Sequence, residues 1–171
     1  MMARGSAQRS AKRPVSRLVP RPLSLRLYPD SILRRVCVPV ERFEGWLSDV
    51  LEEMLALMRT HEGIGLAAPQ VGFTCRLFVT RIEEQPICLA NPVITTYSGR
   101  EEMAEGCLSL PGIRIDIERH RQIEVRGYDS RGRKRRHRVE GLWARVIQHE
   151  IDHLDGVLIC DYRRQHGALE Q

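Results

Sequence analysis

The chain has 171 residues, of which 42% are hydrophobic and 29% charged, values typical of a soluble globular protein. No apolar run approaches the roughly 18 residues that cross a membrane, and the glycine, proline and heptad patterns are too weak for a fibrous chain. The net charge of +5 comes from the first 29 residues, which hold seven basic side chains and no acid; the remainder carries 20 basic and 22 acidic groups. Basicity therefore does not by itself indicate a nucleic-acid-binding fold.

Residues 1–24 are rich in Arg, Ser, Ala and Pro, which predicts a disordered basic extension. An organelle transit peptide has the same composition and is the alternative interpretation. The five cysteines are widely spaced, and the N-terminus lacks the apolar stretch of a secretory signal. Both observations favour free thiols in a reducing compartment over a disulfide framework.

In the rest of the chain, apolar residues recur every three or four positions from Glu44 to Thr60, which predicts an amphipathic helix. Short β-type runs follow, separated by turn-forming residues such as Asn91-Pro92 and Pro111-Gly112. The expected strands cover residues 76–82, 87–89, 93–97, 113–118, 123–128 and 136–140. A second helix is expected from about Gly141 to Asp155, with Gly156 as its stop. The predicted class is α+β, with short antiparallel sheets around this C-terminal helix.

The second predicted helix carries a metal-binding pattern, Gln148-His149-Glu150-Ile151-Asp152-His153. Two histidines four residues apart lie one above the other on a helix, so both imidazoles can point to one ion. Glu150 is placed one step round the helix, where it can reach a water on that ion as a base. Two surface histidines on a charged helix are the alternative interpretation.

A catalytic metal site needs a third protein ligand, and none is expected downstream of the helix. One metalloprotease pattern would place a histidine at position 159, which is Ile here. The third ligand is therefore expected upstream, from a cysteine, an acid, or a histidine among His61, His120 and His137. Cys107 is the strongest candidate, because the flanking Gly and Pro residues leave its backbone accessible and a thiolate binds Zn²⁺ or Fe²⁺ strongly. The other cysteines, Cys37, Cys75, Cys88 and Cys160, are expected to be small buried apolar residues.

The segment from Gly63 to Gln70 matches the dinucleotide-binding pattern GxGxxA, but that site requires a strand before the glycines and a helix after them. Here the predicted order is the reverse. Small residues also keep a backbone open, so that an extended ligand can pair with it as an added strand. Gln70 then offers an amide donor beside the bound ligand.

Taken together and in order, GIGLAAPQ (63–70), EGCLS (105–109) and QHEIDH (148–153) resemble the three signature motifs of peptide deformylases. The resemblance covers roughly residues 25–162. It implies one divalent ion per chain, typically Fe²⁺ with Zn²⁺ or Ni²⁺ able to replace it, held by Cys107, His149 and His153. It also implies Glu150 as the acid/base, and the Gln70 side chain and Leu108 backbone N–H as oxyanion donors. The substrate backbone is expected to pair with Ile64 and Gly65, and the residues expected around its methionine are Ile64, Met103, Glu105, Leu142 and Val146.

The resemblance implies a single catalytic domain over residues 25–171 that removes the formyl group from the N-terminal methionine of nascent chains. A cytoplasmic, bacterial-type location follows from it, or an organellar one if residues 1–24 are a transit peptide. A metallopeptidase and a non-catalytic zinc protein are the alternative functions. Two features are open: Arg145 could narrow or polarise the pocket or extend to solvent, and the basic run 131–138 could contact ribosomal RNA or be a solvated hairpin.

Overall fold

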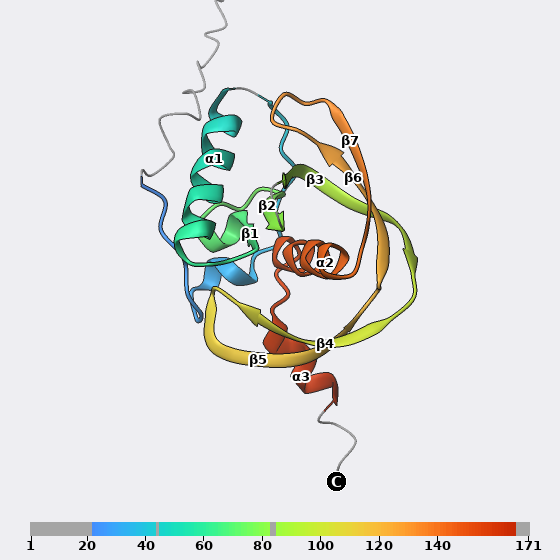
Figure 1. Cartoon of the computed structure of the whole chain (residues 1–171). Helices are drawn as coiled ribbons and strands as arrows, with labels where there is room; N and C mark the ends of the chain where they lie inside the picture. Colours follow the sequence, from blue (N-terminus) through green and yellow to red (C-terminus); the bar gives the residue numbers. More distant parts are fainter. Residues whose placement is uncertain (1–21, 44, 83–84, 167–171) are drawn as a thin grey trace, which may run out of the picture.

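The computed structural model describes residues 22–43, 45–82 and 85–166 (Figure 1). In this part of the chain the helices are α1 (Gly45–Thr60), α2 (Leu142–Leu154) and α3 (Ile159–His166), with two 3-10 helices, η2 (Ser31–Arg34) and η3 (Ala68–Val71). The strands are β1 (Gly65–Ala67), β2 (Leu77–Ile82), β3 (Gln85–Ser98), β4 (Glu101–Cys107), β5 (Leu110–Arg119), β6 (Gln122–Tyr128) and β7 (Lys134–Glu140). The predicted α+β class and the antiparallel sheets are confirmed.

The strands form two sheets, both antiparallel. The larger one has the order β1-β2-β3-β6-β7, and β4 and β5 form a separate hairpin. Strand β1 therefore lies at an edge of the larger sheet, with only β2 beside it. An edge strand offers unpaired backbone groups to another chain.

Helix α2 occupies the middle of the molecule (Figure 1). The larger sheet curves around it on one side, α1 lies on the other, and the β4–β5 hairpin passes below. Its apolar face packs against the sheet: Ala144, Ile147 and Leu154 are fully buried with Phe78 and Leu89. Burial of apolar surface stabilises this arrangement by roughly 25 cal/mol per Å².

Helix α2 also buries polar side chains, which is unusual for a helix held by apolar packing. Those that are less than a tenth exposed are Arg145, Gln148, Glu150 and His153. Buried polar groups cost free energy unless they are partnered, so such a concentration on one helix indicates a functional site.

Strand β3 corrects one sequence prediction. The runs 87–89 and 93–97 are parts of one strand, and Asn91-Pro92 lies inside it as a bulge where the pairing register with β6 shifts. Asn91 adopts a positive φ of 51° there, and its side-chain amide makes two hydrogen bonds with the backbone of Val40. These bonds satisfy the polar groups at the irregularity, so the strand continues where composition alone predicts a turn.

Other element boundaries also differ from the predictions. Strand β4 and helix α3 were not predicted, because β4 is rich in Glu and α3 in polar residues. Pro111-Gly112 lies inside β5 instead of preceding it. The predicted first helix is confirmed from Gly45; its expected start, Glu44, and residues 1–21 of the expected extension lie outside the described residues. No described helix is long and apolar enough to cross a membrane.

Candidate metal centre

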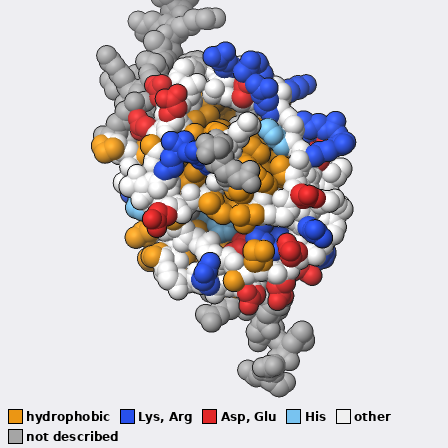
Figure 2. Space-filling view, viewed as in Figure 1, with side chains coloured by type: hydrophobic (Ala, Val, Ile, Leu, Met, Phe, Trp, Pro, Cys, Tyr) orange, Lys and Arg blue, Asp and Glu red, His pale blue; other side chains and the backbone are white. Residues whose placement is uncertain are grey.

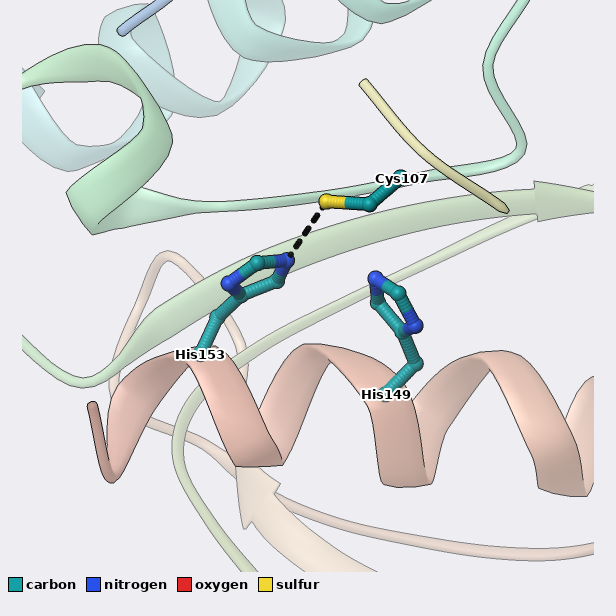
Figure 3. A group of neighbouring side chains, drawn as sticks. All are labelled: Cys107, His149 and His153. Carbon is teal, nitrogen blue, oxygen red and sulfur yellow. Dashed lines mark hydrogen bonds between the residues drawn. The ribbon is translucent and has the colours of Figure 1, made fainter. Parts of the chain in front are cut away.

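The two histidines of the helical motif lie on one face of α2, as their spacing predicts. His149 and His153 are separated by one turn, and their ring centroids are 4.9 Å apart (Figure 3). His153 is almost completely buried, whereas His149 is partly exposed. Helix α2 ends just beyond them at Leu154, and Gly156 follows with a φ of 75° that suits glycine. A Cβ at Gly156 would lie 2.7 Å from the backbone oxygen of Arg34.

Cys107 reaches the same point from the end of β4. Its Sγ lies 3.2 Å from Nε2 of His153, and the sulfur and ring nitrogens converge in Figure 3. One donor atom from each of Cys107, His149 and His153 lies within 4.8 Å of the other two. The β4–β5 turn thus brings a residue from the middle of the chain to a helix that begins 35 residues later.

A divalent ion fits this donor set. One thiol and two imidazoles are the ligand types that Zn²⁺ and Fe²⁺ accept, and three protein ligands leave a position open. Nδ1 of His153 is buried and has no hydrogen-bond partner among the described residues, so its ring is held by packing and by the contact with Cys107. Without an ion, burial lowers the pKa of His149, but hydrogen bonds with Cys107 and Glu105 outweigh it and raise the pKa to about 10. A bound ion would therefore replace a proton at this ring.

Glu150 is buried beside the three donors. Burial raises its pKa to about 7, and its Oε2 has no hydrogen-bond partner among the described residues. The backbone of β1 passes directly over it: a Cβ at Gly65 would lie 2.1 Å from Glu150 Oε1. A carboxyl group that titrates near neutral pH and keeps a free oxygen is suited to accept and return a proton.

Glu105 is a buried acid that contacts both His149 and Arg119, and its position in the motif does not predict these contacts. Its Oε2 lies 2.9 Å from Nδ1 of His149, and Arg119 binds both of its oxygens at 2.8 and 3.0 Å. Burial raises the pKa of Glu105, but the hydrogen bonds from His149 and Arg119 outweigh burial and lower it to about 2. A charged partner on Nδ1 orients the His149 ring and directs its Nε2 toward the other donors.

Arg145 is buried and does not extend to solvent, which excludes one of the interpretations open from the sequence. Its guanidinium lies 2.8 Å from Glu105 Oε1 and also donates to the backbone carbonyls of Ile117, Met103 and Glu101. It therefore ties α2 to both strands of the β4–β5 hairpin.

Sequence reasoning missed the partners of Glu105 on its far side. Arg119 also contacts Asp152 at 2.6 Å and the hydroxyl of Tyr162, which itself donates to Asp152. Arg119 and Asp152 are 43 and 10 residues from Tyr162, so their pairing depends on the tertiary fold. The only sign of this cluster in the sequence was the charged Asp152 inside the HExxH pattern.

Gln70 is fixed in η3 with its amide nitrogen facing the centre. Its Oε1 accepts a hydrogen bond from the backbone of Ala67, and its Nε2 donates to Ser109 Oγ at 3.1 Å and lies 3.7 Å from Cys107 Sγ. Leu108 lies in the turn between β4 and β5 and packs against Gly63. Both expected oxyanion donors are thus in segments that border the three donor atoms.

A pocket of about 640 Å³ opens onto the centre. It lies between the β1 edge, the β4–β5 hairpin and the first half of α2, and its size suits a small-molecule or peptide end. The structure brings all the expected pocket residues to its wall: Ile64, Gly65, Met103, Glu105, Leu142 and Val146. Of these, Ile64, Met103 and Leu142 are more than a third exposed and form the rim.

The other candidate ligands lie elsewhere. His61, His120 and His137 are not in the donor group found among the described residues; His120, for example, stacks on Tyr97. All five cysteines are free, and burial raises the pKa of Cys37 and Cys88 to about 11 and that of Cys75 to about 12. Such thiols are poor nucleophiles and poor ligands at neutral pH.

Comparisons with known proteins agree with this geometry. The family model "Polypeptide deformylase" matches residues 22–168. The peptide deformylase of Dictyoglomus thermophilum is 42% identical over 137 residues, covering 80% of this chain and 90% of the relative. The crystal structure of peptide deformylase from Thermotoga maritima has a TM-score of 0.79 and 41% identity, covering 81% of this chain and 95% of that one. The crystal structure of a Synechococcus elongatus peptide deformylase in complex with actinonin has a TM-score of 0.79 and 43% identity. The match covers 82% of this chain and 79% of that one.

The match extends over most of the chain and includes the segments that carry the centre. The chain therefore belongs to the polypeptide deformylase family and is a metal-dependent enzyme that removes the formyl group from the N-terminal methionine of newly synthesised polypeptides.

Proposed function

We propose that Cys107, His149 and His153 hold one divalent ion in each chain, and that Fe²⁺ is the native ion, with Zn²⁺ or Ni²⁺ able to replace it. The proposal is supported by the 4.8 Å spread of the three donor atoms and by a donor set that combines a soft thiolate with two imidazoles. When bound, the ion supplies Lewis acidity that makes water a nucleophile at neutral pH. The other steps of the reaction are carried out by the side chains and backbone of the protein.

Glu150 is the proposed general base and acid. It takes the proton of the attacking water and later delivers it to the methionine amine as the formyl C–N bond breaks, so that formate and a free N-terminus are released. Its pKa of about 7, raised by burial, suits both directions of proton transfer. Its Oε2, which has no hydrogen-bond partner among the described residues, is free to accept a hydrogen bond from a water molecule.

The developing oxyanion is proposed to receive hydrogen bonds from the Gln70 amide and the Leu108 backbone N–H. Gln70 is oriented for this task, because its carbonyl oxygen is already occupied by Ala67 and only its amide can face the substrate. Loss of one such donor typically costs about 3 kcal/mol of transition-state stabilisation.

The substrate backbone is proposed to add to the sheet along Ile64 and Gly65. Strand β1 is an edge strand, and Ile64 is 42% exposed at the pocket rim. The methionine side chain then enters the pocket against Val146, Leu142 and Met103. An unbranched thioether fills such an apolar wall without a hydrogen-bond requirement.

The convergence of Cys107 with the two α2 histidines carries the proposal, and three variants test it. Cys107→Ala is expected to lose the metal and all activity. Glu150→Gln is expected to keep about one metal per chain while formate release falls by at least about 10³-fold, and Glu140→Gln on exposed β7 is the matched control that keeps both. Metal content is measured after anaerobic purification, which also identifies the ion. Full metal occupancy in Cys107→Ala would show that Cys107 is not a metal ligand. Unchanged turnover in Glu150→Gln would show that Glu150 is not the general base.

Two alternative functions predict different results. A metallopeptidase would cleave unformylated peptides, and a structural zinc protein would show a closed coordination shell without water. We infer that the enzyme works where formyl-methionine starts proteins, in a bacterial-type cytoplasm or, if residues 1–24 direct import, in an organelle. Such nascent chains are available close to the ribosome.

Actinonin is expected to compete with a formyl-methionyl peptide, since it is bound in the Synechococcus relative.

A further inference from the structure

The β6–β7 hairpin carries a basic surface that the deformylation site does not use. Residues 122–140 hold seven basic and three acidic side chains. In Figure 2 the Lys and Arg side chains gather at the upper right, over β6 and β7, while acidic side chains lie at the lower right over the β4–β5 hairpin. The charge is therefore concentrated on one part of the molecule.

A buried carboxylate holds three of these arginines on the outer face of the sheet. Arg126, Arg136 and Arg138 all contact Glu124, whose side chain is 4% exposed, while their own side chains are 56%, 51% and 76% exposed. Each guanidinium uses one or two of its five N–H donors on Glu124. The cluster keeps a net charge of about +2 and presents its remaining donors outward.

The hairpin turn is fixed in a similar way. Asp129 accepts hydrogen bonds from the backbone of Arg131 and Arg133 and pairs with the side chains of Arg133 and Arg135. The neighbouring Tyr128 ring stacks on Phe43 at 5.4 Å. The guanidiniums thus sit on a rigid support, which lowers the entropy lost when they bind an anion.

The spacing of the charges follows from the strand. In β7 alternate residues face the same side, and His137 and Val139 are the half-buried ones, so Lys134, Arg136 and Arg138 face outward together. Successive members are about 7 Å apart along the strand. This spacing is comparable to that of successive phosphates along one RNA strand.

We propose that the outer face of the β6–β7 hairpin binds the phosphodiester backbone of RNA. Planar guanidiniums with free donors are suited to bidentate phosphate contacts. The cluster is bordered by the polar side chains of Thr95 and Gln122 and by the exposed side chain of Val93, which pairs with Arg126. Membrane-surface binders combine basic residues with extended apolar faces, so a vesicle measurement distinguishes the two kinds of partner. Binding here would hold the enzyme near the RNA machinery on which its substrates are made, without contact to the pocket.

The test measures binding of a short fluorescein-labelled RNA hairpin by anisotropy at salt concentrations from about 50 to 200 mM. The variant is Arg131→Gln/Lys134→Gln/Arg136→Gln, and the control is Arg35→Gln/Arg59→Gln/Arg100→Gln, which removes the same charge from exposed positions elsewhere. Each neutralised phosphate contributes about 0.7 to 0.9 to the salt slope, so the variant is expected to have a slope shallower by about 2–3 and an affinity at least about tenfold lower. The control is expected to bind like the wild type, and both are expected to release formate from a formyl-methionyl peptide at the wild-type rate.

Three results would overturn the proposal: equal RNA affinity of the two triple variants, no measurable RNA binding by the wild type at low salt, or binding of anionic lipid vesicles or polyglutamate at least as tight as that of RNA. Deformylation is read separately with the free peptide, so none of these results bears on the metal centre.

Discussion

Glu105 and Glu124 each bind more than one arginine, but the arginines of Glu105 are buried and those of Glu124 are exposed. Glu105 binds Arg119 and Arg145, whose side chains are 5% exposed, and it orients His149. Glu124 binds Arg126, Arg136 and Arg138, whose side chains are at least half exposed. Inside the protein such pairs are screened little and fix geometry, whereas at the surface water and salt weaken them. The same chemistry therefore positions the His149 ring in one place and displays charge in the other.

The largest difference between the two regions is expected in stability. Arg119→Met leaves the buried Glu105 and the partly exposed Asp152 without their shared partner and is expected to destabilise the fold by about 3–5 kcal/mol. Arg136→Met leaves two arginines on Glu124 and is expected to change the urea midpoint no more than other surface substitutions do. Urea unfolding of both variants at equal m-values measures this, and similar midpoint shifts would show that burial does not distinguish the clusters.

A second comparison uses one glycine in each region. In Gly65→Ala the new Cβ would lie 2.1 Å from Glu150 Oε1 and 2.8 Å from a Val146 methyl carbon, so the proposed base must move. Formate release is expected to fall by about 10²-fold, because small displacements at a reacting centre have effects of this size. Gly132→Ala forces alanine into a φ of 73° against Phe43, which is expected to cost about 1–2 kcal/mol of stability and leave turnover unchanged. If Gly132→Ala lost activity and Gly65→Ala did not, the β6–β7 hairpin would not be independent of the deformylation site.

The smallest expected effect is in the dependence of stability on pH and salt. Burial raises the pKa of Glu105, but hydrogen bonds from His149 and Arg119 outweigh it and lower the pKa to about 2; hydrogen bonds from Arg136 and Arg138 likewise hold the pKa of Glu124 below its ordinary value. A depressed pKa means that the unfolded chain binds more protons, so both carboxylates stabilise the fold above about pH 4.5 and lose this effect as the pH falls through the folded pKa.

Salt separates the two contributions. The difference in urea midpoint between the wild type and Glu124→Gln is expected to shrink both toward acid pH and at high salt. For Glu105→Gln it is expected to shrink toward acid pH, down to about pH 2, but not with salt. Equal salt sensitivity of the two differences would contradict the contrast in screening.

The sequence predicted those features that depend on local pattern. The i, i+4 spacing of His149 and His153 required only that α2 be a helix, and the periodicity from Glu44 to Thr60 predicted α1 almost to its ends. The two helices are confirmed because each depends on residues that are close together in the chain. The flanking Gly and Pro residues and the resemblance of the three motifs predicted Cys107 as the third ligand, and this role stays a prediction.

The features that were missed depend on contacts between distant segments. The bulge at Asn91 is satisfied by Val40, which lies 51 residues earlier, so composition alone predicts a turn. Arg145 is retained in the interior by Glu105 and by carbonyls of two strands, which no window around α2 reveals. The cluster around Glu124 arises because β6 and β7 pair residue by residue, bringing Arg136 and Arg138 beside one acid.

The short edge strand β1 also limits what the enzyme can recognise. It is three residues long, Gly65–Ala67, so an added peptide gains main-chain hydrogen bonds over only its first few residues. Main-chain bonds are the same for every amino acid, and in the proposed binding mode only the first side chain enters the pocket. In this mode, proteins that differ only after their first few residues are expected to be bound alike.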